Sequence, residues 1–316
     1  MLNLNKEIKN AKSIGISGHI NPDGDCVGST MALYQYIKKT RPDCDVHIYL
    51  DKPQDIFMCI KDADKIEDAD GVNEVFDIFF ALDCAAERLG ASKHLFESAK
   101  CTINIDHHVS NPGCGDYNYI VPDASSSSEL VYDLLDKDKL DKDIALSLYI
   151  GIIHDTGVLQ YSCTSPKTLK TVSDLISYGF DFPKLIDETF YERTLVESKL
   201  LGQALLDSET FMDGRVIVSQ TETKTLYKFG GTIKDVDGIV SQLRLVKGVE
   251  TAVYIYQVKP DEFKVSLRSN GNVNVSKVCV ELGGGGHERA AGVTLKGSLK
   301  EVTDTVLEKI SQKMGK

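Results

Sequence analysis

The strongest constraint on the fold is the alternation of short apolar strands with helical patterns along the first 105 residues. Four segments are typical of buried strands, at residues 11–18, 45–50, 76–82 and 101–105. Helical patterns fill the intervals between them, at residues 27–39, 54–61 and 92–99. Strands that alternate with helices form βαβ units, whose strands lie parallel in one sheet. The first half is therefore predicted to be an α/β domain with a mostly parallel sheet flanked by helices, to which further helices at residues 126–137, 143–154 and 165–178 belong.

A different pattern begins near residue 185, where strands and helices stop alternating. A helical stretch at 183–207 is followed by strands at 216–220, 251–258 and 262–268, a helix at 275–281, a strand at 291–295 and a final helix at 299–313. This order is typical of an α+β domain. Because 316 residues suffice for about two domains, we expect a larger domain at residues 1–185, a helical linker at 186–207 and a smaller α+β domain at 208–316.

The charge is unevenly divided between the two halves. The chain has a net charge of −11; residues 1–190 carry 18 basic and 31 acidic residues, and residues 191–316 carry 18 and 16. A protein that grips long DNA or RNA needs many lysine and arginine contacts to phosphates, so we expect no long nucleic acid as a ligand. The apolar runs are far shorter than the ~20 residues of a membrane helix, and the first residues lack the apolar stretch of a signal peptide. We therefore expect a cytoplasmic protein that binds no membrane.

Metal-binding side chains follow the ends of the predicted strands. They are His19, Asp23 and Asp25 after the first strand, Asp83 after the third, Asp106, His107 and His108 after the fourth, and Asp155 at the end of a helix. Because ligands of open parallel sheets bind at the carboxyl ends of the strands, we expect these side chains to gather at that edge. So many acidic groups in one place repel each other unless cations lie between them.

The residue types indicate which cations suit this set. One aspartate alone is explained as a turn or a helix cap, but the joint occurrence is not. Carboxylates and imidazoles without a cysteine favour a hard or borderline metal, manganese or magnesium before zinc. Two ions that share one carboxylate would use the whole set and would make a nucleophile from water for phosphoester hydrolysis.

Four segments that contain these residues resemble the motifs of the DHH phosphoesterases, a family named for the triplet found here at 106–108. They are GHINPDGDCVGS at 18–29, LDCAAER at 82–88, IDHH at 105–108 and GIIHDTG at 151–157. The second half resembles the DHHA1 domain through VSLRS at 265–269 and GGGGHERAAG at 283–292. The resemblance covers nearly the whole chain. It implies a DHH domain that holds metal and performs catalysis, followed by a smaller DHHA1 domain that closes over the metal site and binds substrate.

The resemblance also implies a role for each residue of the site. The ligands are, for one divalent ion, His19, Asp23 and Asp83 and, for the other, Asp25, Asp83, His107 and Asp155. Asp83 would bridge two ions, which we expect to be Mn²⁺, with Mg²⁺ or Co²⁺ as alternatives. His108 would stabilise charge at the scissile phosphate or protonate the leaving oxygen, and Asp106 would orient the histidines.

In the DHHA1 domain the resemblance implies contacts to the substrate. The residues are Arg268, Gly284, Gly285, Gly286 and His287. The glycines are expected to form a loop that lets the backbone approach a phosphate closely, and Arg268 and His287 would be the charged contacts.

The chain departs from the family pattern at three positions. Gly18 stands where Ser or Thr is common, Cys26 where a small apolar residue is frequent, and His154 where Thr or Gly is common. None of the three changes removes a ligand. His154 is left with three alternatives: a proton donor, a further metal contact or a packed histidine.

Chain length and the glycine block narrow the choice of substrate. The chain is too short for the extra oligonucleotide-binding domain of RecJ-type exonucleases, and the family's manganese pyrophosphatases lack the GGGH signature. What remains resembles the bacterial oligoribonucleases of the nanoRNase type, which implies hydrolysis of short RNA from an end and of adenosine 3′,5′-bisphosphate. A linear or cyclic dinucleotide phosphodiesterase would share every catalytic residue, and an exopolyphosphatase and a non-catalytic nucleotide sensor are further alternatives. A homodimer is expected only because it is the commonest assembly of soluble oligomers.

Overall fold

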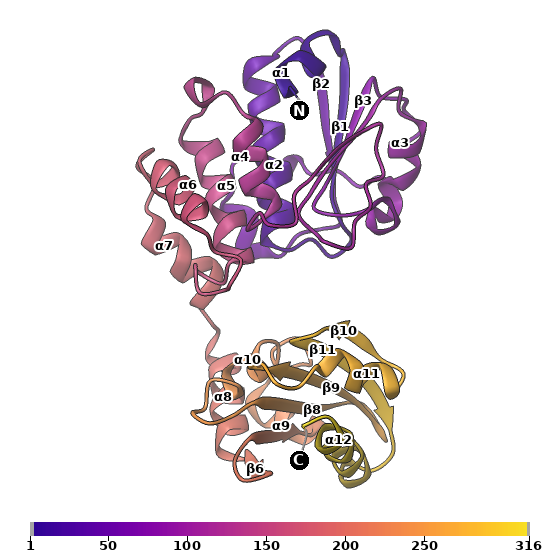
Figure 1. Ribbon diagram of the computed structural model, residues 1–316, viewed down its shortest axis with the longest axis vertical. Coiled ribbons are helices and arrows are strands. Elements are labelled where there is room, and N and C mark those ends of the chain that lie inside the picture. The colour runs from indigo at the N-terminus through magenta and orange to yellow at the C-terminus, as the bar shows by residue number, and fades with distance from the viewer. Residues whose placement is uncertain (1–2, 315–316) are drawn as a thin grey trace. The chain divides into compact units, whose positions relative to one another are not determined.

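The computed structural model describes residues 3–314, which form two compact units, one up to Glu192 and the other from Arg193 onward. The boundary falls inside the segment 186–207, in which we expected a helical linker. Each unit has a sheet and hydrophobic cores of its own (Figure 1). Within residues 3–314, every helix is too short or too polar to span a membrane.

The first unit is built on a five-stranded sheet in which all neighbouring strands are parallel. Its order is β2-β1-β3-β4-β5, with β1 at Ser13–Ser17, β2 at Asp45–Tyr49, β3 at Ile78–Leu82, β4 at Thr102–Asp106 and β5 at Tyr117–Ile120. The predicted parallel α/β domain is thus confirmed, and the first four strands lie within the apolar segments or beside them. The fifth strand was not predicted because Tyr117 and Asn118 are exposed and the strand has no apolar alternation.

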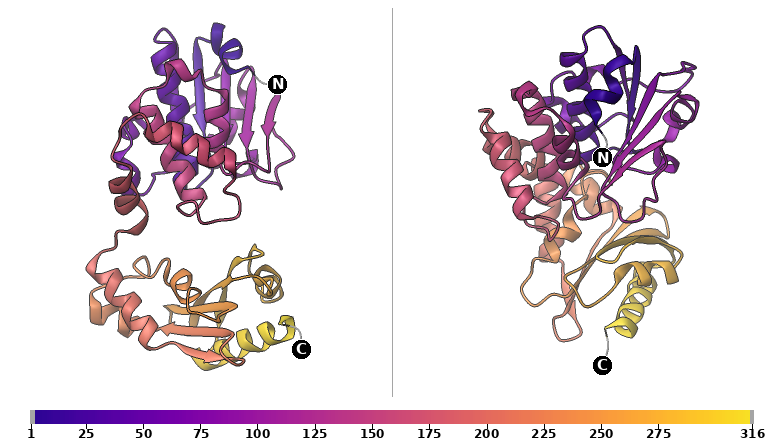
Figure 2. Two further views of the ribbon diagram at one scale, coloured as in Figure 1. Left: turned by 60° about the vertical axis from the view of Figure 1, so that its left-hand side comes forward. Right: turned by 45° about the horizontal axis from the view of Figure 1, so that its top comes forward.

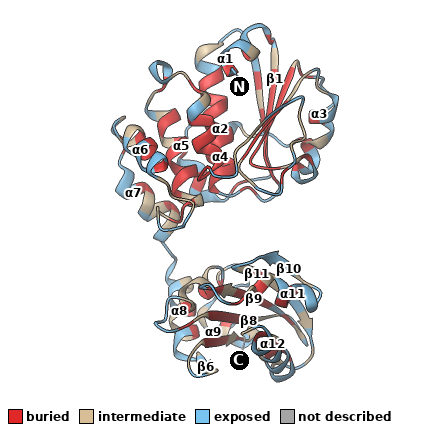
Figure 3. Ribbon diagram, viewed as in Figure 1, coloured by how far each residue is buried: buried red, intermediate tan, exposed pale blue. Residues whose placement is uncertain are grey.

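Helices cover both faces of this sheet (Figure 1). They are α2 (Gly24–Thr40), α4 (Ser127–Leu134) and α5 (Lys142–Asp155) over one face, α3 (Lys93–Ser98) over the other, and α1 (Leu4–Glu7), α6 (Pro166–Ile176) and α7 (Phe182–Ile186) around them. In β3, Phe80 and Leu82 belong to the core beneath α2 and α5, whereas Phe79 and Ala81 pack against α3. Successive residues of a strand point to opposite faces, so the sheet is buried on both sides, as are α2 and α5 (Figure 3).

Two predicted helices are corrected. The segment 54–61 contains only a short 3₁₀ helix, Asp55–Cys59, after which Asp62 adopts the left-handed conformation at φ 62°. The long stretch at 183–207 is broken: α7 continues as a π-helical turn, Asp187–Tyr191, and α8 (Leu195–Leu206) begins anew. The break arises because Thr194 caps α8: its hydroxyl accepts the Glu197 N–H, and the Glu197 carboxylate accepts the Thr194 N–H.

The second unit contains a six-stranded sheet between two layers of helices. Its order is β10-β11-β9-β8-β7-β6, with β6 at Glu209–Phe211, β7 at Val216–Thr221, β8 at Thr251–Lys259, β9 at Glu262–Ser269, β10 at Gly285–His287 and β11 at Ala290–Lys296. Neighbours are antiparallel except β7 and β8, which are parallel. The smaller α+β domain is thereby confirmed.

The two faces of this second sheet follow from the alternation of its apolar residues. Ile217, Ala252 and Tyr254 pack against α8, α9 (Thr223–Phe229) and α10 (Ile239–Leu243). Val218 and Val253 pack on the opposite face with α11 (Val275–Glu281) and α12 (Leu299–Lys313). Figure 2 shows α12, in yellow, lying along that sheet.

The glycine block differs from its expected form. Gly285, Gly286 and His287 form the edge strand β10, paired with β11, and not a free loop. The pairing partner begins three residues further on, at Ala290, so a tight turn connects the two strands. Glycine runs are poor strand formers, which is why the sequence pattern alone predicted a loop.

Candidate metal centre

The residues expected to bind metal come together at the carboxyl edge of the first sheet. The His107 Nε2 atom lies 3.3 Å from Asp155 Oδ2, 3.5 Å from Asp83 Oδ1 and 3.9 Å from Asp25 Oδ2. The His19 Nε2 atom lies 3.4 Å from Asp83 Oδ2 and 3.6 Å from Asp23 Oδ2. All six predicted ligands therefore form one cluster, with Asp83 in its centre.

Asp83 joins the two halves of this cluster. Its Oδ1 oxygen faces His107 and its Oδ2 oxygen faces His19. Asp83 follows β3 directly and adopts φ 59°, a left-handed conformation that aspartate tolerates better than most residues. The Asp83 N–H donates to the Ile105 carbonyl at the end of β4, which fixes the carboxylate between the two histidines.

Asp25 is held by the start of a helix. It lies in the first turn of α2, is 1% exposed, and its carboxylate accepts the backbone N–H groups of Ser127 at 2.6 Å and Ser128 at 2.9 Å. These groups begin α4, and the positive end of a helix dipole stabilises an anion. The Ser127 hydroxyl donates to Asp83 Oδ1 at 3.1 Å. Ser127 was not among the residues expected at the site; the four consecutive serines at 125–128, where a predicted helix begins, are the signal for it in the sequence.

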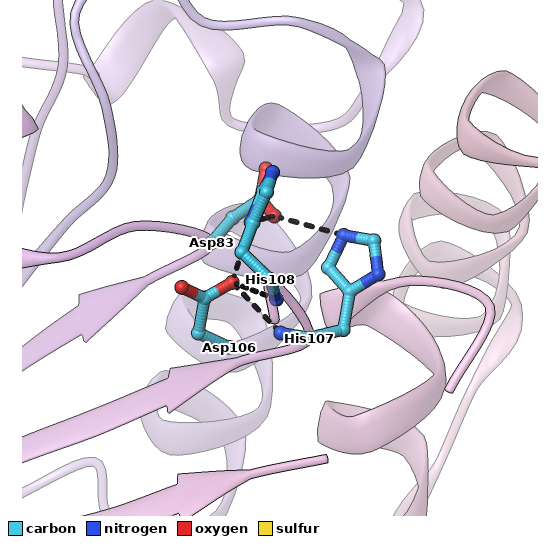
Figure 4. Close-up of side chains that lie close together, drawn as sticks. All are labelled: Asp83, Asp106, His107 and His108. Carbon is cyan, nitrogen blue, oxygen red and sulfur yellow. Dashed lines mark hydrogen bonds and ion pairs between the residues drawn. The ribbon is translucent and has the colours of Figure 1, made fainter. Parts of the chain in front are cut away.

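Asp106 has a different position from the six expected ligands. It is fully buried at the end of β4, and its Oδ1 accepts the backbone N–H groups of His107 and His108 and the Nδ1–H of His108, the last at 2.7 Å (Figure 4). Its Oδ2 accepts the Asn111 side-chain N–H at 2.6 Å. Asp106 thus fixes the His107–His108 backbone and the orientation of the His108 ring.

The two central histidines attract protons strongly. Burial lowers the pKa of His19, but hydrogen bonds to Asp23 and Asp83 outweigh it and raise the pKa to about 10. Burial also lowers the pKa of His107, but the bond to Asp83 and the charges of Asp25 and Asp155 raise it to about 10. The carboxylates around the two Nε2 atoms therefore favour a positive charge at both positions.

The carboxylates show the complementary effect. Burial and the charges of Asp83 and Asp155 raise the pKa of Asp25, and burial raises the pKa of Asp155 to about 7. For Asp83, burial acts in the same direction, but hydrogen bonds from His107 and His19 hold its pKa below the usual range. The raised pKa values mean that bound protons reduce the repulsion between these carboxylates. Metal cations between the carboxylates would reduce the same repulsion.

The donor set fits divalent metal ions. The His19 Nδ1 atom lies 2.9 Å from the Ile20 carbonyl, so that Nδ1–H donates there and Nε2 is directed at the carboxylates. Among the described residues, three overlapping groups have donor atoms within 4.8 Å of one another, and Asp83 belongs to two of them. The groups are Asp83 with Asp106, His107 and His108; His19 with Cys26 and Asp83; and Asp25 with His107 and Asp155.

Cys26 lies beside His19 and Asp83 in this cluster, although no role at the site was expected for it. Burial raises the pKa of its thiol well above the usual value, so the thiol stays protonated. A Cβ atom at Gly18 would lie 2.3 Å from the Cys26 Sγ atom. The Cys26 sulfur therefore occupies the space that a side chain at position 18 would need.

The predicted substrate-binding residues lie in the second unit. His287 of β10 and Arg268 of β9 both pair with Ala290 of β11, so the three form one row across the sheet. Directly paired residues of antiparallel strands share a face, and the small Ala290 separates the two basic side chains. The structure thus brings Arg268 and His287 to one face of one sheet.

The three glycines of the block that are expected to bind substrate have different surroundings. A Cβ atom at Gly284 would lie 2.3 Å from the Gly292 carbonyl oxygen, and one at Gly286, where φ is 140°, would lie 2.5 Å from the Ala290 oxygen. A Cβ atom at Gly285 would meet nothing within 4 Å. Packing therefore explains Gly284 and Gly286, whereas the second unit itself gives no steric reason for glycine at position 285.

The sequence matches known proteins over nearly its whole length. The family model for the DHH family, N-terminal domain, matches residues 13–152, and the model for the DHHA1 domain matches residues 213–316. A bifunctional oligoribonuclease and PAP phosphatase, NrnA, of Thermus thermophilus is 30% identical over 306 residues, which cover 95% of this chain and 90% of that protein. The chain belongs to the DHH family.

Two further proteins resemble this DHH protein. NrnA of Bacillus subtilis, also named a bifunctional oligoribonuclease and PAP phosphatase, is 28% identical over 283 residues, 88% of this chain and 87% of that protein. The crystal structure of an exopolyphosphatase-related protein from Bacteroides fragilis matches with a TM-score of 0.88 and 24% identity, over 97% of this chain and 94% of that one. The structural likeness shows a shared fold, and the family predicted from the motifs is confirmed.

Proposed function

We propose that this DHH protein is a two-metal phosphoesterase that shortens oligoribonucleotides of a few nucleotides from one end and removes the 3′-phosphate of adenosine 3′,5′-bisphosphate. The observation that carries the proposal is the position of Asp83, whose two carboxylate oxygens face His19 and His107. One shared carboxylate between two sets of ligands is what a pair of metal ions requires. The names of the two NrnA relatives support this choice of substrates.

The metal ions would be held by residues of the first unit. We assign one ion to His19, Asp23 and Asp83 and the other to Asp25, Asp83, His107 and Asp155. When bound, two such ions polarise the phosphoryl oxygens and supply a nucleophile from water near neutral pH. We propose Mn²⁺ because mixed imidazole and carboxylate ligands suit a borderline cation, and Mg²⁺ and Co²⁺ would fit the same set.

His108 is the residue that we assign to the leaving group. Its Nδ1–H bond to Asp106 leaves Nε2 on the opposite side of the ring. That same bond raises the pKa of His108, so the ring retains a proton that it can donate to the leaving oxygen. Asp106 acts through His108, by keeping the ring oriented, and does not contact the phosphate itself.

Recognition is assigned to the second unit. We propose that Arg268 and His287, the two ends of the row across β9, β11 and β10, bind phosphate groups of the terminal nucleotide, with Gly284, Gly285 and Gly286 beside them. Few cationic side chains are involved, and the chain carries a net charge of −11. Both features favour substrates with few phosphates over long nucleic acid. We propose that residues 1–185 form the catalytic DHH domain and residues 208–316 the DHHA1 domain, with 186–207 between them; the two compact units meet within this segment, at Glu192 and Arg193.

The proposal is tested with one substrate panel. Purified protein loaded with Mn²⁺ is incubated with a diribonucleotide, a pentaribonucleotide, adenosine 3′,5′-bisphosphate, a cyclic dinucleotide, polyphosphate and a 20-mer DNA, and phosphate release and chain shortening are measured. We expect hydrolysis of the first three substrates and little of the 20-mer.

Other outcomes would assign other functions. Preferred hydrolysis of the cyclic dinucleotide or of polyphosphate, with the short RNA left intact, would contradict the proposed substrates while keeping the metal chemistry. Turnover that stays negligible on every substrate, and equally so in Asp83→Asn, would indicate a nucleotide sensor.

A further inference from the structure

His154 directly precedes the expected ligand Asp155 in α5, but its ring nitrogens belong to none of the groups of possible ligand atoms found among the described residues. Its ring lies edge-on between Phe57, at a centroid distance of 5.0 Å, and Phe190, at 5.5 Å. The ring is therefore packed within an aromatic environment.

The same ring lies against the backbone that carries two of the expected ligands. A Cβ atom at Gly24 would lie 2.3 Å from the His154 Cγ atom and 2.4 Å from its Cβ atom. Gly24 is the residue between Asp23 and Asp25 at the start of α2. His154 thus contacts the Asp23–Asp25 segment with its side chain and is covalently joined to Asp155. These two segments supply three of the six expected ligands.

The Nε2 atom of the His154 ring forms a hydrogen bond to a residue in another turn of the chain. The His154 Nε2 atom lies 3.0 Å from the Thr189 hydroxyl, and that hydroxyl donates its own proton to the Leu185 carbonyl at 2.7 Å. Thr189 therefore accepts the Nε2–H of His154. Thr189 lies in the π-helical turn Asp187–Tyr191, just before the first unit ends at Glu192. Single π turns occur often at functional sites.

We propose that His154 is a positioning residue that sets the spacing between the Asp23–Asp25 segment and Asp155, and that its hydrogen bond to Thr189 fixes this spacing to the π turn. The inference rests on the proposed two-metal function and deepens it. A metal pair needs its ligands at fixed separations, and residues that orient ligands without touching the metal typically affect metal affinity or activity by 10–100-fold. Loss of the ring would remove the contact of its Cγ atom with Gly24 and the hydrogen bond to Thr189, whereas the Cβ contact with Gly24 would remain in alanine.

The experiment has two parts, Mn²⁺ binding in the absence of substrate and then turnover. Mn²⁺ is titrated by calorimetry into the full-length wild type, His154→Ala, Thr189→Val and Thr189→Ser, and kcat on a diribonucleotide is then measured as a function of Mn²⁺ concentration. We expect His154→Ala to weaken Mn²⁺ binding by about tenfold and Thr189→Val to weaken it several-fold. Thr189→Ser, which keeps the hydroxyl, should restore binding. Excess Mn²⁺ should return kcat of the weakened variants toward the wild-type value.

His94→Ala serves as the matched control, since its ring nitrogens bond to the Ala91 and Val72 carbonyls elsewhere in the same unit. It should leave Mn²⁺ affinity unchanged. If His154→Ala lowers kcat at every Mn²⁺ concentration with unchanged affinity, His154 donates a proton and the inference is wrong. If only the thermal midpoint falls, His154 is a packing residue and the inference is equally wrong.

Two further comparisons apply if a variant does not fold or if the wild type is inactive. Should His154→Ala fail to fold, the comparison of Thr189→Val with Thr189→Ser decides, because equal Mn²⁺ affinities in these two would overturn the inference. Should the wild type bind two Mn²⁺ ions but hydrolyse none of the panel substrates, the proposed function fails while the calorimetry still determines the role of His154.

Discussion

The two units place their functional residues in opposite environments. In the first, Asp25 and Asp83 expose 1% and 2% of their surface and are held by helix N–H groups and imidazoles. In the second, all three residues of β10 are exposed, and Gly285 has no neighbour that would resist a side chain. The cluster in the first unit is held in place by its own scaffold, whereas the packing of the second unit does not restrict the residue at position 285. Chemistry and recognition should therefore respond to different substitutions.

The largest effect is expected from Asp83→Asn. Asparagine tolerates the left-handed conformation at this position, but it removes the charge that faces both histidines. Turnover of a diribonucleotide should fall by more than the 10–100-fold typical of indirect positioning residues, and calorimetry should show fewer bound Mn²⁺ ions. A variant that keeps a tenth of wild-type turnover would show that Asp83 is not the shared ligand.

Asp106→Asn should act within the first unit without removing metal. An amide oxygen is a weaker acceptor for the His108 Nδ1–H than the carboxylate, so the ring is less firmly oriented. We therefore expect kcat to fall by about 10–100-fold while two Mn²⁺ ions still bind. Parallel kinetics and calorimetry on the same sample separate the two effects. Loss of one bound ion would instead place Asp106 among the metal ligands.

Gly285→Ala should change recognition alone. Its new methyl group meets no atom of the second unit, so the thermal midpoint should stay unchanged while KM for a diribonucleotide rises about tenfold through loss of close backbone approach. Gly284→Ala is the matched control, because its methyl group would collide with the Gly292 carbonyl and should lower the thermal midpoint. Equal KM values for Gly285→Ala and wild type would show that this strand does not contact the substrate.

The smallest effect concerns acid stability of the first unit. Burial raises the pKa of Glu129, but bonds from Ser125, Thr168 and Lys167 outweigh it and lower the pKa below the usual value. The stabilisation from these bonds is thus present above about pH 4.5 and is lost as the pH falls through the lowered pKa. In denaturant titrations, Glu129→Gln should be less stable by roughly 1 kcal/mol at pH 7, and this difference should shrink toward pH 3. A difference independent of pH would contradict the assignment.

The sequence was most informative where one local rule determines position. Strand β3 is a continuous apolar run, and β1 and β4 carry isoleucines at alternate positions. The side chains that follow these strands had to reach the same edge of a parallel sheet. The expected positions of His19, Asp83 and His107 followed from that rule and the family motifs. No contact with another part of the chain had to be known.

Features that depend on distant partners were missed. Ser127 contributes through Asp25 and Asp83, which lie far away in sequence. The strand β10 exists because β11 pairs with it, although its glycines have low strand propensity. The break before α8 was readable in the Thr194 and Glu197 capping box, but the apolar pattern on either side of it suggested a continuous helix.

The strand β10 has one further consequence, for self-association. It is the last strand of its sheet within residues 3–314, so its outer backbone groups face no neighbouring strand there. The Ser276 hydroxyl at the start of α11 donates to the Gly286 carbonyl at 2.7 Å, so a helix covers part of this edge and limits its pairing with an extended peptide or another copy of the chain. The β10 length of three residues and the charged Glu288 and Arg289 that follow also restrict this pairing. Engineering that lengthens β10 with β-branched residues to rigidify the sheet would therefore make the protein more prone to aggregate.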